Sequence, residues 1–195
     1  MDRRSHYLEV AVQLFLEHGF NGVSMDHLVA TAGGSKATLY RYFDSKEKLF
    51  EAMIADISQR TAPPGTPDDL AALDLETGLR NIGRATAAAA LSERVIVLLR
   101  LALGEFARFP SLATTLFNHG PAMSYDRLNR FIAAKQAAGE VVVADTQIAS
   151  EQFLAGIVGH QQMRMALGVG APSPADIEKR IDAAIAAFIA TYRAR

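Results

Sequence analysis

The residues whose types and spacing carry chemistry lie in a short basic stretch near the N-terminus. Between residues 33 and 48 four cations, Lys36, Arg41, Lys46 and Lys48, stand against two acids. Positive side chains neutralise phosphates, and small or hydroxyl-bearing residues among them can meet base edges in a major groove. Because the whole chain has a net charge of only −1, it is this local excess that predicts contact with nucleic acid.

The residues of this stretch divide into two expected roles. Lys46 and Tyr42 are expected to hold phosphates, through an ammonium at a helix start and a hydroxyl. Ala37 and Thr38 are small and are expected to face base edges. The full set predicted to bind DNA is Ser24, Ser35, Lys36, Ala37, Thr38, Tyr40, Arg41, Tyr42 and Lys46. The competing interpretation is a solvated charged face, which is the usual role of surface cations.

Two short helices separated by glycines are expected to present these side chains. Residues 25–32 repeat apolar side chains at helical spacing, and Ser24 before them can accept a hydrogen bond from a first-turn amide. Gly33 and Gly34 interrupt the pattern, and Gly33 suits a left-handed turn. Ser35 can cap a second helix. This order of caps, helices and glycines is that of a helix-turn-helix.

The same region resembles the signature of the TetR family of bacterial transcription regulators. The matching strings are Leu14-Phe15, His18-Gly19-Phe20, Val23-Ser24-Met25, Ala32-Gly33, Ser35 to Phe43 and Ser45 to Leu49. The resemblance implies an all-helical homodimer that binds double-stranded operator DNA. Two positions depart from the family pattern, Val29 in place of a small alanine and Gly34 in place of a valine or isoleucine. We expect their volumes to compensate, so that Gly34→Val alone would overpack the turn.

The rest of the chain is also expected to be helical. The strand-like run over residues 141–143 has no neighbour to pair with, so we interpret it as an extended connector. The sequence predicts an all-α protein of about nine helices. Residues 1–50 would form a three-helix helix-turn-helix domain, and residues 51–195 a helical bundle for ligand binding and dimerisation. The segment 100–139 resembles, more loosely, the AefR-like C-terminal domain of some TetR regulators.

Helix boundaries are predicted from breakers and from periodicity. Gly19 should end the first helix, and the prolines of residues 62–67 should end the fourth. Residues 68–91 are predicted to form one helix. Residues 93–109 are apolar nearly all round, which is typical of a central helix surrounded by others. Residues 173–176, Ser-Pro-Ala-Asp, are a strong helix start.

Large apolar side chains with a few polar ones between them could line a ligand cavity in the C-terminal helices. The family resemblance implies an unidentified small-molecule effector there. The candidate lining residues are Leu103, Phe106, Phe117, Met123, Gln161 and Met165. Taken one by one, these residues are more typical of ordinary core and surface than of a ligand site.

The last two helices are the expected dimer surface. Gly156 and Gly159 remove side chains from one helix, which would allow a close approach. Ile181, Ile185 and Phe188 form an apolar stripe on the other. The stripe either packs within its own domain or meets a second copy, and the resemblance implies a four-helix bundle between two copies.

Composition and spacing argue against several other classes. Cys is absent, which excludes disulfides, thiolate nucleophiles and cysteine metal sites. The five scattered histidines lack zinc-motif spacing, and residues 33–36 lack the glycine that a phosphate-binding loop needs before its lysine. We expect no catalytic residue, metal, cofactor or membrane segment, and a cytoplasmic location. The alternative is an all-helical small-molecule-binding protein or enzyme with a non-functional helix-turn-helix.

Overall fold

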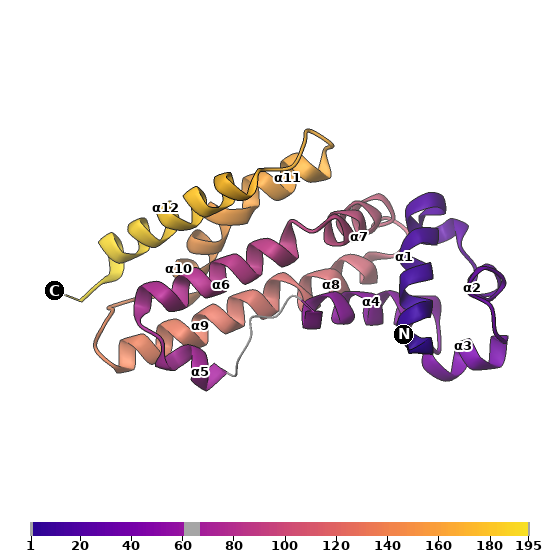
Figure 1. Cartoon of the computed structure of the whole chain (residues 1–195), viewed down its shortest axis with the longest axis horizontal. Coiled ribbons are helices and arrows are strands. Elements are labelled where there is room, and N and C mark those ends of the chain that lie inside the picture. The colour runs from indigo at the N-terminus through magenta and orange to yellow at the C-terminus, as the bar shows by residue number, and fades with distance from the viewer. Residues whose placement is uncertain (1, 61–66, 195) are drawn as a thin grey trace. The chain divides into compact units, whose positions relative to one another are not determined.

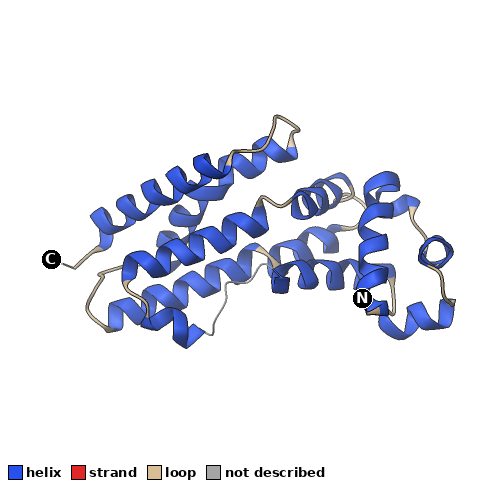
Figure 2. Ribbon diagram, in the orientation of Figure 1, coloured by secondary structure: helices blue, strands red, loops and turns tan. Residues whose placement is uncertain are grey.

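The computed structural model describes residues 2–60 and 67–194, and every regular element among them is a helix (Figures 1 and 2). The chain forms two compact units. Unit 1 consists of Met1–Gln59 and Glu93–Gly120, and unit 2 of Arg60–Ser92 and Pro121–Arg195. The all-α prediction is therefore confirmed. The predicted functional division between residues 50 and 51 stays a prediction.

Unit 1 joins the N-terminal helices to two helices from later in the chain. Its helices are α1 (Arg3–Gly22), α2 (Met25–Ala32), α3 (Lys36–Tyr42), α4 (Lys46–Arg60), α7 (Glu93–Gly104) and α8 (Pro110–His119). Phe20 is fully buried, and its ring packs edge-on against Phe50 and Phe109, with centroids 5.9 and 5.1 Å apart. Leu98 and Leu112 belong to the same apolar core. The helix-turn-helix region thus shares one core with α7 and α8.

Unit 2 is a bundle built around α6. Its elements are α5 (Pro67–Ala72), α6 (Leu75–Ala90), α9 (Pro121–Ala137), α10 (Thr146–Leu154), the π-helical turn η1 (Ala155–Gly159), α11 (His160–Ala166) and α12 (Pro174–Tyr192). Helix α6 packs against α9, α12 and η1 (Figure 1). A Cβ atom at Gly78 would overlap the ring of Phe131, so glycine allows the close approach of α6 to α9.

Two predicted helices differ in the structure. The single helix expected over residues 68–91 is wrong: α5 ends at Ala72, and Asp74 caps α6 by accepting a hydrogen bond from the Thr77 amide (2.9 Å). The expected central helix over residues 93–109 is also wrong, because α7 ends at Gly104 and Leu103 is 63% exposed. An apolar sequence does not require burial on every side.

Other boundaries follow the sequence. Gly19 has a φ of +69° and interrupts α1, as predicted. Ser173 caps α12 in a reciprocal capping box with Asp176. The extended residues near 141 do find a partner, because Val141 forms an antiparallel bridge with Arg193 beyond the end of α12. The predicted break before Pro67 lies outside the described residues.

Within the described ranges, no helix is both long and apolar enough to cross a membrane.

Candidate DNA-binding site

Serine side chains fix the starts of α2 and α3. The Ser24 hydroxyl accepts a hydrogen bond from the His27 amide at 3.0 Å, and Ser35 accepts one from the Thr38 amide at 3.1 Å. Both caps satisfy amides that a helix start leaves without partners. Gly33 ends α2 with a φ of +71°, so the predicted cap, helix, glycine, cap and helix order is present.

The turn between α2 and α3 is held by α1. The Tyr7 hydroxyl donates to the Gly33 carbonyl (3.2 Å), and the His6 ring lies 3.1 Å from the Ala32 carbonyl. Gly34 has a φ of +99°, and a Cβ there would lie 2.7 Å from the Tyr7 hydroxyl. The overpacking expected of Gly34→Val is thus explained by contact with α1, and the expected compensation by Val29 stays a prediction.

Helix α3 carries an exposed face of cations, an alanine and a phenol. Leu39 is fully buried and fixes the helix to the core, while Tyr40 is 41% exposed. Lys36, Ala37 and Arg41 are exposed on the same helix. These side chains can donate to phosphate oxygens or approach base edges in a groove. The predicted reading surface is thus accessible on a short, capped helix.

Two contacts orient the cations of this face. The Lys36 ammonium lies 2.7 Å from the Asp26 carboxylate, and this hydrogen bond raises the pKa of Lys36. The Arg41 guanidinium lies 5.3 Å from the ring centroid of Tyr42. An exposed ion pair contributes little to stability. Its effect here is to direct Lys36 towards α2, so a phosphate would have to compete with Asp26 for the ammonium.

Lys46 makes contacts in the structure that its sequence neighbours do not predict. Its ammonium donates to the carbonyls of Phe20 (2.8 Å) and Val23 (2.9 Å) and lies 4.4 Å from the Phe20 ring centroid. Burial lowers the pKa of Lys46, while Glu47 and Glu105 act in the opposite direction. Two of its three donors are used within the protein. No local pattern could signal this contact, because its partners lie 23 and 26 residues away.

Comparison with known families decides the class of this protein. Residues 8–53 match the family model described as "Bacterial regulatory proteins, tetR family", and residues 77–194 match "AefR-like transcriptional repressor, C-terminal domain". The chain belongs to the TetR family. It is a DNA-binding transcription regulator with a helix-turn-helix at α2 and α3.

Two solved structures match this TetR-family regulator over nearly its whole length, and one curated relative matches less than half of it. The solved structure of the Flavonoid-responsive Regulator FrrA is 32% identical with a TM-score of 0.80, covering 99% of this chain and 98% of that one. A TetR regulator from Agrobacterium tumefaciens is 26% identical with a TM-score of 0.78, covering 100% and 97%. The uncharacterised regulator Mb1581 of Mycobacterium bovis is 38% identical over 86 residues, which are 42% of each chain. This match spans less than half of that curated relative.

The predicted ligand residues of this TetR-family regulator are divided between the two units. Leu103, Phe106 and Phe117 belong to unit 1, and Met123, Gln161 and Met165 belong to unit 2. Leu103, Phe106, Phe117 and Met123 are 47–63% exposed. Gln161 is buried and, with its amide oxygen turned towards Arg180, accepts hydrogen bonds of 3.1 and 2.6 Å from that guanidinium. Their role in ligand binding stays a prediction.

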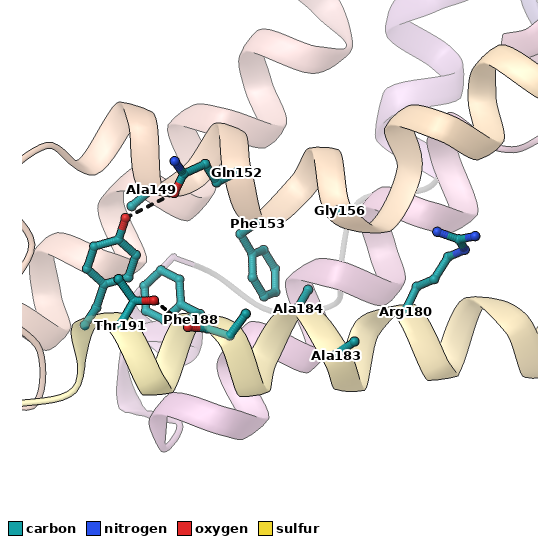
Figure 3. Close-up of a pocket in the computed structure, with 11 residues that line it drawn as sticks. Ala149, Gln152, Phe153, Gly156, Arg180, Ala183, Ala184, Phe188 and Thr191 are labelled. Atoms are coloured by element: carbon teal, nitrogen blue, oxygen red, sulfur yellow. Dashed lines mark hydrogen bonds between the residues drawn. The ribbon is translucent and has the colours of Figure 1, made fainter.

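An open groove of about 340 Å³ lies in unit 2 between α12 and the helix formed by α10 and η1 (Figure 3). Gly156, Ala183 and Ala184 line it with little side-chain volume. Phe153 and Phe188 also line it, and their rings pack edge-on with centroids 5.9 Å apart. The lining is therefore mainly apolar, with Gln152, Arg180, Thr191 and Tyr192 as its polar members.

The predicted dimer residues divide between this groove and the core. Gly156 and Phe188 line the groove, and Phe188 is also buried in the core of unit 2. Ile181 and Ile185 are buried in the core of unit 2, as the alternative interpretation of the stripe requires. Gly159 is exposed at the end of η1. The π turn that contains it was not predicted from the sequence.

Proposed function

We propose that this TetR-family regulator is a homodimeric repressor that binds a palindromic operator and is released by a small apolar or amphipathic effector. The observation that carries the DNA-binding part is the exposed face of α3 with Lys36, Ala37, Tyr40 and Arg41. The similarity of residues 77–194 to the AefR-like repressor domain supports the negative sign of regulation.

On the operator, α3 enters the major groove. Ala37 and Thr38, near its N-terminus, face base edges, where a methyl or hydroxyl can meet a thymine methyl or a polar edge. Lys36, Arg41 and Tyr42 contact phosphates on the groove walls. The capping serines Ser24 and Ser35 also lie at the DNA surface. A dimer places two copies of α3 in successive major grooves, about 34–36 Å apart.

The second copy covers the groove between α10–η1 and α12. Its lining of glycine, alanine and phenylalanine suits the close packing of another pair of helices. An isologous contact of this kind uses the same surface on both copies. Such a dimer gives the two-fold symmetry that a palindromic operator requires.

The effector is proposed to be an aromatic or amphipathic compound held by the C-terminal helices. The relative FrrA is named as flavonoid-responsive, which makes planar polyphenols the first class to test. The contacts predicted from the sequence lie in different units and stay a prediction: Leu103, Phe106 and Phe117 in unit 1, and Met123, Gln161 and Met165 in unit 2. The protein acts by binding and not by catalysis. Its proposed location is the cytoplasm, where bacterial chromosomal DNA is accessible.

One experiment tests the proposal in two steps. The full-length protein is first used to select sequences from a random duplex pool, and palindromes with a fixed half-site spacing should be enriched. Binding should weaken as salt is added, because phosphate contacts release counterions. A panel of flavonoids and fatty acids is then tested for release. A protein that enriches no sequence and binds no duplex would support the alternative, a helical ligand-binding protein with a non-functional helix-turn-helix.

A further inference from the structure

The turn that precedes α2 is held from two sides by side chains distant in the sequence. This turn, residues 20–23, follows the kink at Gly19 and leads directly into Ser24, the N-cap of α2. We refer to it as the clamped turn. Its amide at Asn21 and its carbonyls at Phe20 and Val23 are all used in hydrogen bonds to side chains.

Lys46, at the first position of α4, holds the carbonyl side. Its ammonium donates to Phe20 and Val23 at 2.8 and 2.9 Å, and it rests against the Phe20 ring. These carbonyls are otherwise left open because the helical turn is too short to satisfy them. A charged donor to two carbonyls is stronger than a neutral one, so Lys46 sets the distance between the clamped turn and α4.

Glu105, just after α7, holds the amide side. Its Oε1 accepts a hydrogen bond from the Asn21 amide at 3.2 Å and lies 3.6 Å from where a Cβ would stand on Gly19. A side chain at Gly19 would thus contact the carboxylate. The Phe20 ring, packed against Phe109, keeps this end of the turn against the same segment.

We propose that Lys46 and Glu105 are positioning residues for DNA reading: together they fix residues 20–23, and so the placement of α2 and α3, without contacting DNA. For Lys46 this role replaces the phosphate contact predicted from the sequence. The proposal rests on the proposed DNA binding by α3. It also makes the segment after α7 a direct determinant of how the helix-turn-helix is held.

A residue that contacts phosphate and a residue that positions the helix-turn-helix give different results when their charge is removed. Loss of a phosphate contact lowers the slope of log affinity against log salt by about 0.9 and weakens all sequences alike. Loss of a positioning contact leaves the slope unchanged and reduces the preference for operator over random duplex. For Glu105 even the sign differs, since removing an acid near DNA strengthens binding if its only effect is electrostatic.

The experiment measures binding of the full-length protein to its selected operator and to a random duplex over a range of salt concentrations. The variants are Lys46→Met, which keeps the aliphatic stem, and Glu105→Ala. Glu105→Gln is the conservative variant, because its amide oxygen can still accept from Asn21. Lys48→Met is the matched charge control, since Lys48 is exposed and paired with Glu51 on its own helix. Hydrogen exchange of the Asn21 amide reports on the clamped turn itself.

We expect Lys46→Met and Glu105→Ala to reduce the operator-to-random ratio by about 2- to 30-fold, with slopes unchanged and faster exchange at Asn21 in Glu105→Ala. Glu105→Gln and Lys48→Met should keep the wild-type ratio. The proposal is overturned if Lys46→Met lowers the slope and keeps the ratio, or if Glu105→Ala binds as tightly as wild type. If the wild-type protein binds no DNA, the proposed function fails, and unchanged Asn21 exchange in Glu105→Ala would overturn the clamp separately.

Discussion

The two units of this regulator use polar side chains in different ways. In unit 1 they bond mainly to the backbone: serines cap α2 and α3, Tyr7 holds the Gly33 carbonyl, and Lys46 holds two more. In unit 2, Asp74 and Ser173 also cap helices, but charged side chains pair across helices as well, as in Arg84 of α6 with Glu178 of α12 at 2.8 Å. Backbone contacts fix where a helix begins, whereas exposed ion pairs mostly select neighbours. We therefore expect the loss of one side-chain-to-backbone hydrogen bond in unit 1 to lower stability more than the loss of one exposed ion pair in unit 2.

The largest effect is expected at the turn of the helix-turn-helix. Gly34→Val should destabilise the protein by about 2–4 kcal/mol, because it combines a positive φ with contact to the Tyr7 hydroxyl. Gly33→Ala should cost less, since its φ is positive but the space around it is open. Chemical unfolding compares the two. An equal loss in both variants would show that the Tyr7 contact is unimportant.

Removing the caps should have the next largest effect. Ser24→Ala and Ser35→Ala should each cost about 1 kcal/mol, because each leaves a helix-start amide without its partner. Thr31→Ala is the control, as its exposed hydroxyl bonds to a carbonyl within α2 and caps nothing. Thermal unfolding of the three variants gives the comparison. If both cap variants were as stable as Thr31→Ala, the capping side chains would not contribute measurably to the stability of unit 1.

The ion pairs of unit 2 should contribute less to stability than either the glycine turn or the helix caps. Arg84→Met should lower stability only slightly at low salt, since both partners of the ion pair are roughly half exposed. Added salt should reduce the difference from wild type, because exposed charges are screened. Urea unfolding at low and high salt measures this. A loss of several kcal/mol that persists in high salt would mean that unit 2 depends on its charges as unit 1 depends on its caps.

The smallest effect concerns pH and the start of α12. The Ser173 hydroxyl hydrogen-bonds to Asp176 and lowers the pKa of that carboxyl in the folded state. A lowered pKa contributes stability above the unfolded value, about 3.9, which is lost as pH falls through the folded value. Asp176→Asn should therefore flatten the acid limb of stability below about pH 4. If the free energy of unfolding fell with pH in the same way in Asp176→Asn as in wild type, protonation of Asp176 would not be coupled to folding.

The sequence predicted the parts of the structure that depend on neighbours along the chain. The caps at Ser24, Ser35 and Ser173, and the break at Gly19, follow from residues within one turn. The start of α6 at Asp74 was missed although its signal is local, because the apolar pattern continues on both sides. The contacts of Lys46 and of Tyr7 could not be predicted, because they join residues that only the folded chain brings together.

The central claim is that α3 in unit 1, and not charge in general, binds DNA. The measurement is operator affinity against salt for two variants with the same change in charge, Lys36→Ala with Arg41→Ala on α3 and Arg80→Ala with Arg84→Ala on α6. The α3 variant should lose affinity at every salt concentration, with its slope reduced by about 0.9 for each phosphate contact removed. The α6 variant should bind like wild type. Equal losses of affinity and slope in both variants would contradict the assignment of α3 as the DNA-binding surface.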